Sequence, residues 1–203
     1  MIKKLLACLV FFMPLSAEVK VLAFAGSARQ DSYNKTLVQE AAEIARTLGA
    51  TVTVIDLKDY PIPIYDADLE TKEGMPINAR RIRNLMIESN AMIISSPEYN
   101  GSIPALLKNV LDWTSRTEDG KFSKVPYQGK KIAIMSASPG KKGGAKALPH
   151  LRAIIADCGG DVIPLQISVP TAYQAFDTKG HLMNPQLKED LKKEIQQLLQ
   201  TTS

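Results

Sequence analysis

Short apolar runs alternate along the chain with longer segments whose apolar residues recur every three or four positions. The apolar runs predict β-strands, and the recurring pattern predicts amphipathic helices. Repeated strand–helix pairs are typical of a parallel sheet with helices on both faces. The predicted strands cover residues 19–25, 51–56, 91–95, 130–136 and 162–167, and the predicted helices cover 35–48, 76–89, 104–113, 145–158 and a last helix striped by Leu187, Leu191, Ile195 and Leu198.

Two segments refine this outline. Pro164 lies inside the last apolar run, and because proline has no N–H to give to a strand ladder, this run is predicted to be an edge strand. Residues 57–74 are rich in proline and aspartate and predict a long surface loop. Neither segment is a repeat or an interdomain linker, so residues 18–203 are expected to form one domain.

The loops that leave the carboxyl ends of the strands are the places to look for a ligand site. In parallel sheets ligands bind there, at the point where the strand order reverses. The loops after the first, third and fourth predicted strands are rich in polar residues and glycine. In the flavodoxin-like strand order 2-1-3-4-5 these three strands are neighbours. We therefore expect a three-layer α/β sandwich with five parallel strands in that order, in which the three loops converge on one crevice.

The loop after the first predicted strand, residues 26–34, combines a helix start with many side-chain donors. Free backbone N–H groups at a helix N-terminus attract an anion. The loop has neither the Gly-Lys-Ser/Thr ending of a P-loop nor the glycines of a dinucleotide fingerprint, so it suits a terminal phosphate monoester. The alternative is a polar turn in which Ser32 or Asn34 caps the helix. The donor side chains of the loop are Ser27, Arg29, Ser32 and Asn34.

Composition narrows the class of partner and of chemistry. The chain has 203 residues and a net charge of +4, and its basic residues are scattered without interleaved aromatics, which argues against a nucleic-acid surface. The two cysteines, Cys8 and Cys158, have no metal or redox spacing. The two histidines, His150 and His181, have no serine or cysteine partner in a recognisable motif. We therefore predict no metal site, no nucleophile and no general base.

The first 17 residues have the layout of a secretory signal peptide. Lys3 and Lys4 precede an apolar run over residues 5–12, and cleavage is conceivable after Ala17. The run is too short for a transmembrane anchor, so no integral membrane association is expected. The alternatives are a non-native extension, or a true start at Met13.

Two motifs at the expected separation resemble those of the NAD(P)H-dependent FMN reductase family, and most closely its bacterial chromate and quinone reductase branch. They are Gly26-Ser27-x-Arg29-x-x-Ser32-x-Asn34 and Pro97-Glu98-Tyr99-Asn100-x-Ser102-x-Pro104. The resemblance extends over nearly the whole chain from Val19 to the last helix. It implies that bound FMN passes hydride from NADPH or NADH to a small acceptor such as a quinone, an azo compound or chromate.

The same resemblance assigns residues to the cofactor. The first loop would hold the FMN phosphate, and residues 97–100 would lie against the isoalloxazine ring. Residues 136–144 would close the other side, with glycines that let the backbone approach the flavin. No side chain is assigned a catalytic role, since the cofactor performs the hydride transfer. The predicted cofactor-binding residues are Ser27, Arg29, Ser32, Asn34, Pro97, Glu98, Tyr99, Asn100, Ser136, Gly143 and Gly144.

Three properties stay open at this point. An FMN-binding electron carrier of the flavodoxin type, without direct reactivity toward NAD(P)H, is the alternative function. A homodimer is expected from the resemblance, and a tetramer is possible. The family works in the cytoplasm, where NAD(P)H is available, whereas the signal-like segment favours export to the periplasm.

Overall fold

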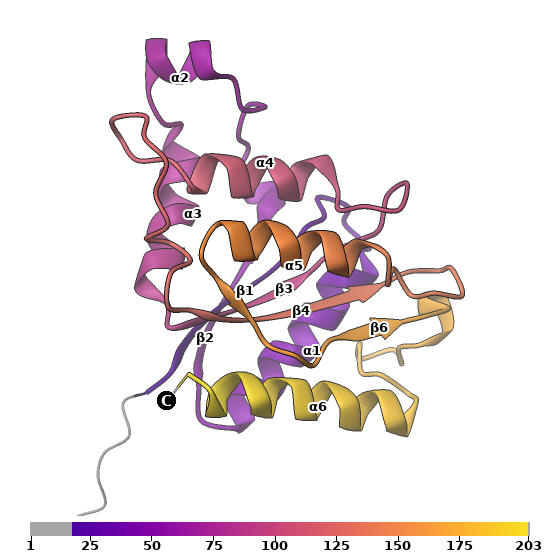
Figure 1. The fold of residues 1–203 in the computed structure, drawn as a ribbon. Helices are drawn as coiled ribbons and strands as arrows, with labels where there is room; N and C mark the ends of the chain where they lie inside the picture. Colours follow the sequence, from indigo (N-terminus) through magenta and orange to yellow (C-terminus); the bar gives the residue numbers. More distant parts are fainter. Residues whose placement is uncertain (1–17, 203) are drawn as a thin grey trace, which may run out of the picture.

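The computed structural model describes residues 18–202 and consists of one parallel sheet with helices on both faces (Figure 1). The strand order is β2-β1-β3-β4-β5. This confirms the expected order of the five strands. A sixth strand, β6, pairs with residues 135–137 of β4, after the part of β4 that pairs with β5. The strands are β1 (Lys20–Ala25), β2 (Thr51–Asp56), β3 (Ala91–Ser95), β4 (Lys131–Ala137), β5 (Asp161–Val162) and β6 (Ile167–Val169).

Two helices cover one face of the sheet, and three cover the other (Figure 1). The residues of β1 alternate between the two layers: Val21 and Ala23 pack under α1 and α6, while Leu22 and Phe24 pack under α3, α4 and α5. Because both faces of β1 pack against helices, the strand fixes the starting point of the loop that follows it. The helices are α1 (Tyr33–Thr47), α2 (Ala67–Glu73), α3 (Ile77–Glu88), α4 (Ala105–Thr114), α5 (Ala147–Asp157) and α6 (Pro185–Gln200), with short 3₁₀ turns η1 (Leu57–Asp59) and η2 (Ala172–Gln174).

The last predicted strand is divided in two, which corrects the expectation of one continuous strand over 162–167. β5 ends at Val162, β6 begins at Ile167, and Pro164 lies in the segment between them. Arg152 of α5 bonds this segment, since its guanidinium donates to the carbonyl oxygens of Val162 and Ile163 at 2.8 and 3.0 Å. A side chain therefore replaces the strand partner that these carbonyls lack.

Residues 57–74 are also more ordered than the predicted loop. They contain η1 and α2, and α2 projects from the body of the molecule as an arm (Figure 1). Tyr65 meets Trp113 edge to face at 4.9 Å between ring centroids, and Glu70 forms a two-pronged ion pair with Arg116. The hydrogen bonds from Arg116 lower the pKa of the Glu70 carboxyl below its usual value, although burial acts in the opposite direction.

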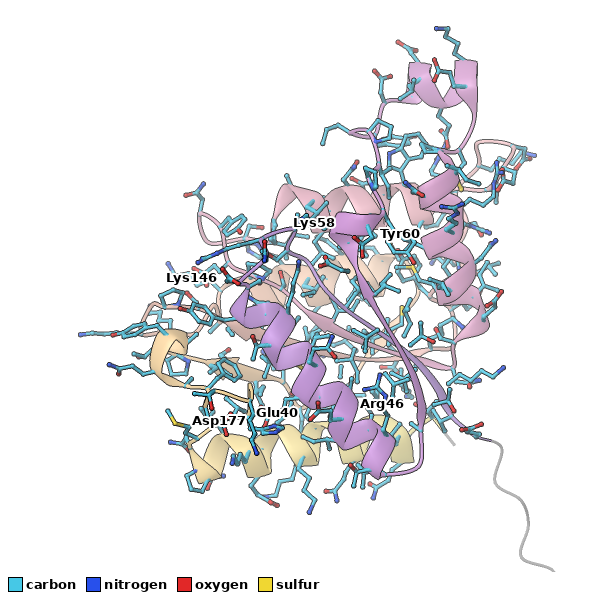
Figure 2. The ribbon with its side chains drawn as sticks, turned by 180° about the vertical axis from the view of Figure 1, so that it is seen from behind. Glu40, Arg46, Lys58, Tyr60, Lys146 and Asp177 are labelled. Atoms are coloured by element: carbon cyan, nitrogen blue, oxygen red, sulfur yellow. The ribbon has the colours of Figure 1, made fainter. Side chains whose placement is uncertain are left out.

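The segment before α6 is fastened to α1 by a buried carboxylate. Glu40 of α1 accepts the N–H of Leu182 at 2.9 Å, and Figure 2 shows Glu40 beside Asp177 where α1 meets that segment. Burial raises the pKa of Glu40. This contact holds α6 and the chain leading into it against the first helix.

Two expectations concerned the N-terminal segment and membrane association. The predicted signal peptide, residues 1–17, lies outside the residues that the structure describes. Within residues 18–202, every helix is too short or too polar to cross a bilayer.

Candidate functional site

A pocket lies at the carboxyl ends of β1, β3 and β4, where the loops of these strands meet. The three strands are adjacent, with Ala25 opposite Ser95 and Ser95 opposite Met135, so their following loops leave the sheet side by side. This is the crevice expected from the strand order. The pocket is lined by Ser27, Arg29, Ser32, Tyr33, Asn34, Pro97, Glu98, Tyr99, Ala137, Ser138 and Pro139.

The first loop offers donors that the protein itself does not use. Ser32 stands at the N-cap of α1, yet its side chain makes no capping hydrogen bond. Arg29 is exposed, and its guanidinium has no ion pair with any residue that the structure describes. The hydroxyl of Ser27 is largely buried and accepts the N–H of Arg29 at 3.2 Å, which leaves its proton to donate. Free donors at a helix start form an anion site.

Asn34 lies in the same pocket but is already engaged. Its Nδ2 donates to the carbonyl oxygen of Ala137 at 2.8 Å, and its Oδ1 accepts the N–H of Ala137 at 2.9 Å. The Oδ1 also accepts the hydroxyl of Ser95 at 2.8 Å. The amide thus bonds Ala137 as the peptide group of a neighbouring strand would, at the point where β3 has ended and β4 continues. Asn34 therefore holds the floor of the pocket together.

The loop after β3 folds into a tight turn. Tyr99 and Ser102 exchange both backbone hydrogen bonds, at 2.9 and 3.1 Å. Asn100 and Gly101 between them have φ angles of 53° and 81°, as a two-residue hairpin turn with two left-handed positions requires. Pro97 is buried at its base, while Tyr99 is 56% exposed. The turn places the exposed Tyr99 at the edge of the crevice.

The loop after β4 packs tightly, and three predicted residues make close contacts within the protein there. Ser136 is fully buried and donates to the carbonyl oxygen of Ser96 at 2.6 Å. A Cβ on Gly144 would lie 2.0 Å from the Ser136 Oγ, and one on Gly143 would lie 2.7 Å from the carbonyl carbon of Val169. Both glycines also have positive φ. Their small size lets the loop pack on its own neighbours, and none of these three residues lines the pocket.

Two side-chain contacts connect the loops after β3 and β4. Glu98 accepts the backbone N–H of Lys146 at 3.0 Å, and the Nδ1 of His150 lies 2.9 Å from the hydroxyl of Ser102. Because Lys146 is the N-cap of α5, the carboxylate of Glu98 also lies at the positive end of that helix. The carboxylate of Glu98 is therefore bound by the backbone of Lys146 and not by the donors of the first loop.

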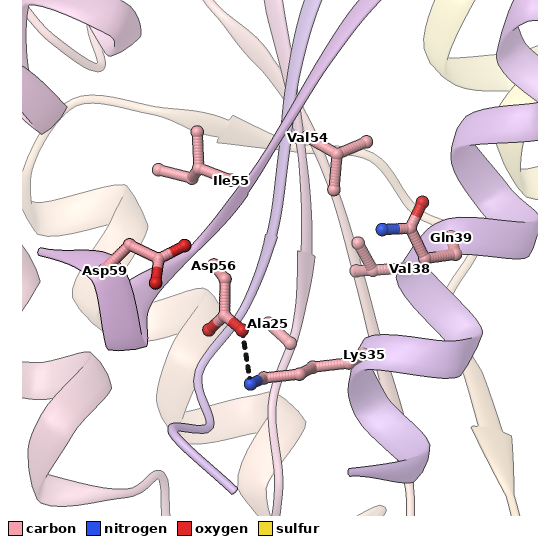
Figure 3. A pocket seen from close by; sticks show the side chains of 8 residues that line it. All are labelled: Ala25, Lys35, Val38, Gln39, Val54, Ile55, Asp56 and Asp59. Carbon is pink, nitrogen blue, oxygen red and sulfur yellow. Dashed lines mark hydrogen bonds and ion pairs between the residues drawn. The ribbon is translucent and has the colours of Figure 1, made fainter. Parts of the chain in front are cut away.

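A larger cavity lies outside this crevice, between β2 and α1 (Figure 3). Lys35 and Asp56 face each other across it, with 2.6 Å between Nζ and Oδ2. Burial alone would raise the pKa of Asp56, but the bonds from Lys35 and the Lys58 backbone lower it. The ion pair satisfies both charges, and Asp59 adds a further carboxylate, so this cavity disfavours an anion.

The pocket thus brings together seven of the eleven predicted residues: Ser27, Arg29, Ser32, Asn34, Pro97, Glu98 and Tyr99. Asn100 lies in the turn that follows Tyr99, and Ser136, Gly143 and Gly144 lie at the end of β4 and in the loop after it, without lining the pocket. Sequence reasoning missed Tyr33, Ala137, Ser138 and Pro139. The last three lie within the predicted loop 136–144, and a rule favouring the first residues after the predicted strand would have chosen them.

The chain is similar to known oxidoreductases over most of its length. The family model of NADPH-dependent FMN reductases matches residues 19–174. An NAD(P)H-dependent FMN reductase of Pseudomonas aeruginosa is 34% identical over 187 residues, covering 91% of this chain and 95% of that protein. A quinone reductase of Escherichia coli K12 is 33% identical over 141 residues, covering 70% and 71%. The solved structure of FerB, a flavoenzyme NAD(P)H:(acceptor) oxidoreductase from Paracoccus denitrificans, superposes with a TM-score of 0.73 at 25% identity, covering 91% of this chain and 97% of that one.

Proposed function

The chain belongs to the NADPH-dependent FMN reductase family, and from this premise we propose that it holds FMN in the crevice of β1, β3 and β4 and reduces a quinone-type acceptor. Membership confirms the expected class, an FMN-dependent oxidoreductase that uses NAD(P)H. When bound, the flavin supplies the hydride transfer between the nucleotide and the acceptor. The single observation that best supports the proposal is that three loops converge on one pocket, and that the loop after β1 offers it donors without a partner in the protein.

The residues of the crevice fit FMN. A phosphate monoester needs several donors, which Ser27, Arg29 and Ser32 offer. The other end of the crevice is lined by Pro97, Tyr99 and other apolar groups, as a flavin ring requires. We assign the phosphate to the first loop and the ring to the loops after β3 and β4. Asn34, Ser136, Gly143 and Gly144 position these loops.

The first prediction tests the activity and separates it from the carrier function. We expect NADPH or NADH to bleach the FMN-loaded protein anaerobically, because an open crevice admits a nicotinamide beside the ring end. Since one crevice serves donor and acceptor in turn, steady-state rates with a quinone are expected to give parallel double-reciprocal lines. A yellow protein that no nucleotide bleaches would establish the electron carrier instead, and intersecting lines would exclude the alternating use of one site.

We further propose a homodimer. Several large apolar side chains are exposed on the α2–α3 side of the molecule and in the connection after α4, which favours a second copy as their cover. They are Ile64, Ile77, Phe122 and Val125. A sedimentation measurement of the FMN-loaded protein tests this.

We also propose that residues 1–17 direct export and are removed after Ala17. The support is the sequence alone, with two lysines followed by an apolar run. The second prediction is that the periplasmic fraction contains a chain whose mass corresponds to a start at Glu18. A full-length chain found only in the cytoplasm would contradict export.

A further inference from the structure

The loop after β6 forms the outer support of the crevice. Ser138, which lines the pocket, donates its N–H to the carbonyl oxygen of Val169 at 3.1 Å and accepts the N–H of Ala172 at 3.0 Å. Thr171 donates its N–H to the carbonyl oxygen of Gly140 at 3.3 Å. The missing side chain of Gly143 lets the two loops touch, as its close approach to Val169 requires. Residues 169–172 are therefore fixed rigidly against the site.

Thr171 has an unusual backbone. Its φ and ψ angles of 50° and 43° are left-handed, and among residues 18–202 the only other non-glycine residue with positive φ is Asn100. For a β-branched residue this conformation is an outlier that the surroundings must hold in place. Such residues gather at functional sites. Here the two outliers lie in the loops on opposite sides of the loop after β4.

Each of the two outliers stands near an exposed tyrosine. Tyr99 precedes Asn100 and is 56% exposed, and Tyr173 follows Thr171 by two residues and is 58% exposed. Tyr127, by contrast, is fully buried, and Tyr65 packs on Trp113. Two loops at the carboxyl edge of the sheet, each with a left-handed residue, thus leave an aromatic ring exposed.

We propose that Tyr173 is a specificity-determining residue, which contacts planar aromatic acceptors on the side of the crevice opposite Tyr99. This inference rests on the proposed function. The chemistry favours flat, conjugated molecules, because aromatic rings attract each other through stacked or edge-to-face contacts. A compact inorganic acceptor has no ring for such a contact. Tyr173 is thus expected to select among acceptors without binding FMN.

The third prediction compares two acceptors in the FMN-loaded, full-length protein. Tyr173→Ala should raise the KM for menadione, a planar two-ring quinone, about three- to tenfold, the range of one aromatic contact. The KM for ferricyanide, the kcat and the affinity for FMN should stay unchanged. Tyr173→Phe should behave as the wild type, since it keeps the ring. Leu48→Ala removes an exposed apolar side chain, 40% exposed, at the end of α1 opposite the pocket, and should change neither KM.

A binding measurement gives a readout apart from turnover. Titration with 2-naphthoate, which is planar and not reducible here, is followed through the visible spectrum of bound FMN, and Tyr173→Ala should weaken it by a similar factor. An unchanged naphthoate affinity and menadione KM would overturn the inference, as would an equal loss with ferricyanide. Because this titration needs only bound FMN, it tests Tyr173 even if NAD(P)H fails to bleach the flavin, so the two failures are distinguishable.

Discussion

Replacing Asn34 with alanine is expected to lower the free energy of unfolding by about 3 kcal/mol, although the residue lies in a ligand pocket. The change removes three hydrogen bonds at once, and leaves the N–H and the carbonyl oxygen of Ala137 without their partner. Ala137 is 3% exposed and Ser95 is fully buried, so the groups that lose the amide are poorly placed to bond to bulk water instead. Each buried polar group left unpaired costs about 1–3 kcal/mol.

The measurement is chemical denaturation of the FMN-free protein, with two comparison variants. Arg29→Ala removes an exposed guanidinium, so it should leave stability unchanged but weaken FMN binding about tenfold or more, as for a hydrogen bond to a charged group. Asn78→Ala removes an asparagine near the surface, whose amide donates to the carbonyl of Pro61 and accepts from the guanidinium of Arg81, and should cost only about 0.5 kcal/mol. Equal stabilities for Asn34→Ala and Asn78→Ala would contradict the role assigned to Asn34.

Asn34 also marks the limit of what the sequence predicts about this site. The strand order and the three convergent loops follow from local patterns, because each loop directly follows its strand in the chain. Whether a donor in such a loop is free cannot be predicted that way. Asn34 is used by Ala137, which lies 103 positions further along the chain, whereas Ser32 in the same loop is not used. The two residues look equivalent in the motif and differ only through long-range contacts.

The break between β5 and β6 is a feature of the fold that local sequence does not predict. Pro164 predicts an edge strand but not its interruption, because the break depends on the guanidinium of Arg152, which bonds the carbonyls of the intervening segment. The resemblance predicts that Gly143 and Gly144 let the backbone approach the flavin, and their close neighbours within the protein are Val169 and Ser136. A glycine in a motif indicates a close approach, and only the structure identifies the group that approaches.

The second large effect concerns Glu194, a carboxylate on the buried face of α6. The residue is 0% exposed, and neither oxygen forms a hydrogen bond within the described residues. Burial raises the pKa of this carboxyl well above its ordinary value, and the attraction of the Ile167 backbone and of Arg152 offsets this only in part. Leu191, Ile195 and Leu198 surround it on the same helix face. A charge here is unfavourable.

The pH dependence follows from where the proton is bound. Above the ordinary pKa of glutamate the unfolded chain loses its proton, while the folded chain retains it up to the raised pKa. The folded state then binds more protons than the unfolded state, so the contribution of Glu194 to stability falls as the pH rises through this window. Glu194→Gln, which resembles the protonated acid at every pH, removes the dependence.

Glu194→Gln is therefore expected to match the wild type near pH 4 and to exceed its free energy of unfolding at pH 8, by about 1.4 kcal/mol for each pH unit over which the folded wild type retains a proton that the unfolded chain has lost. Denaturant unfolding at a series of pH values measures this. Glu189→Gln is the control, because Glu189 lies on the same helix with its side chain 52% exposed and should give a curve parallel to the wild type. If Glu194→Gln also ran parallel to the wild type, the carboxyl would titrate normally and would have to be accessible to water. Since α6 packs against β6, a gain at pH 8 would show that stability is lost with rising pH at a position close to the loop that carries Tyr173.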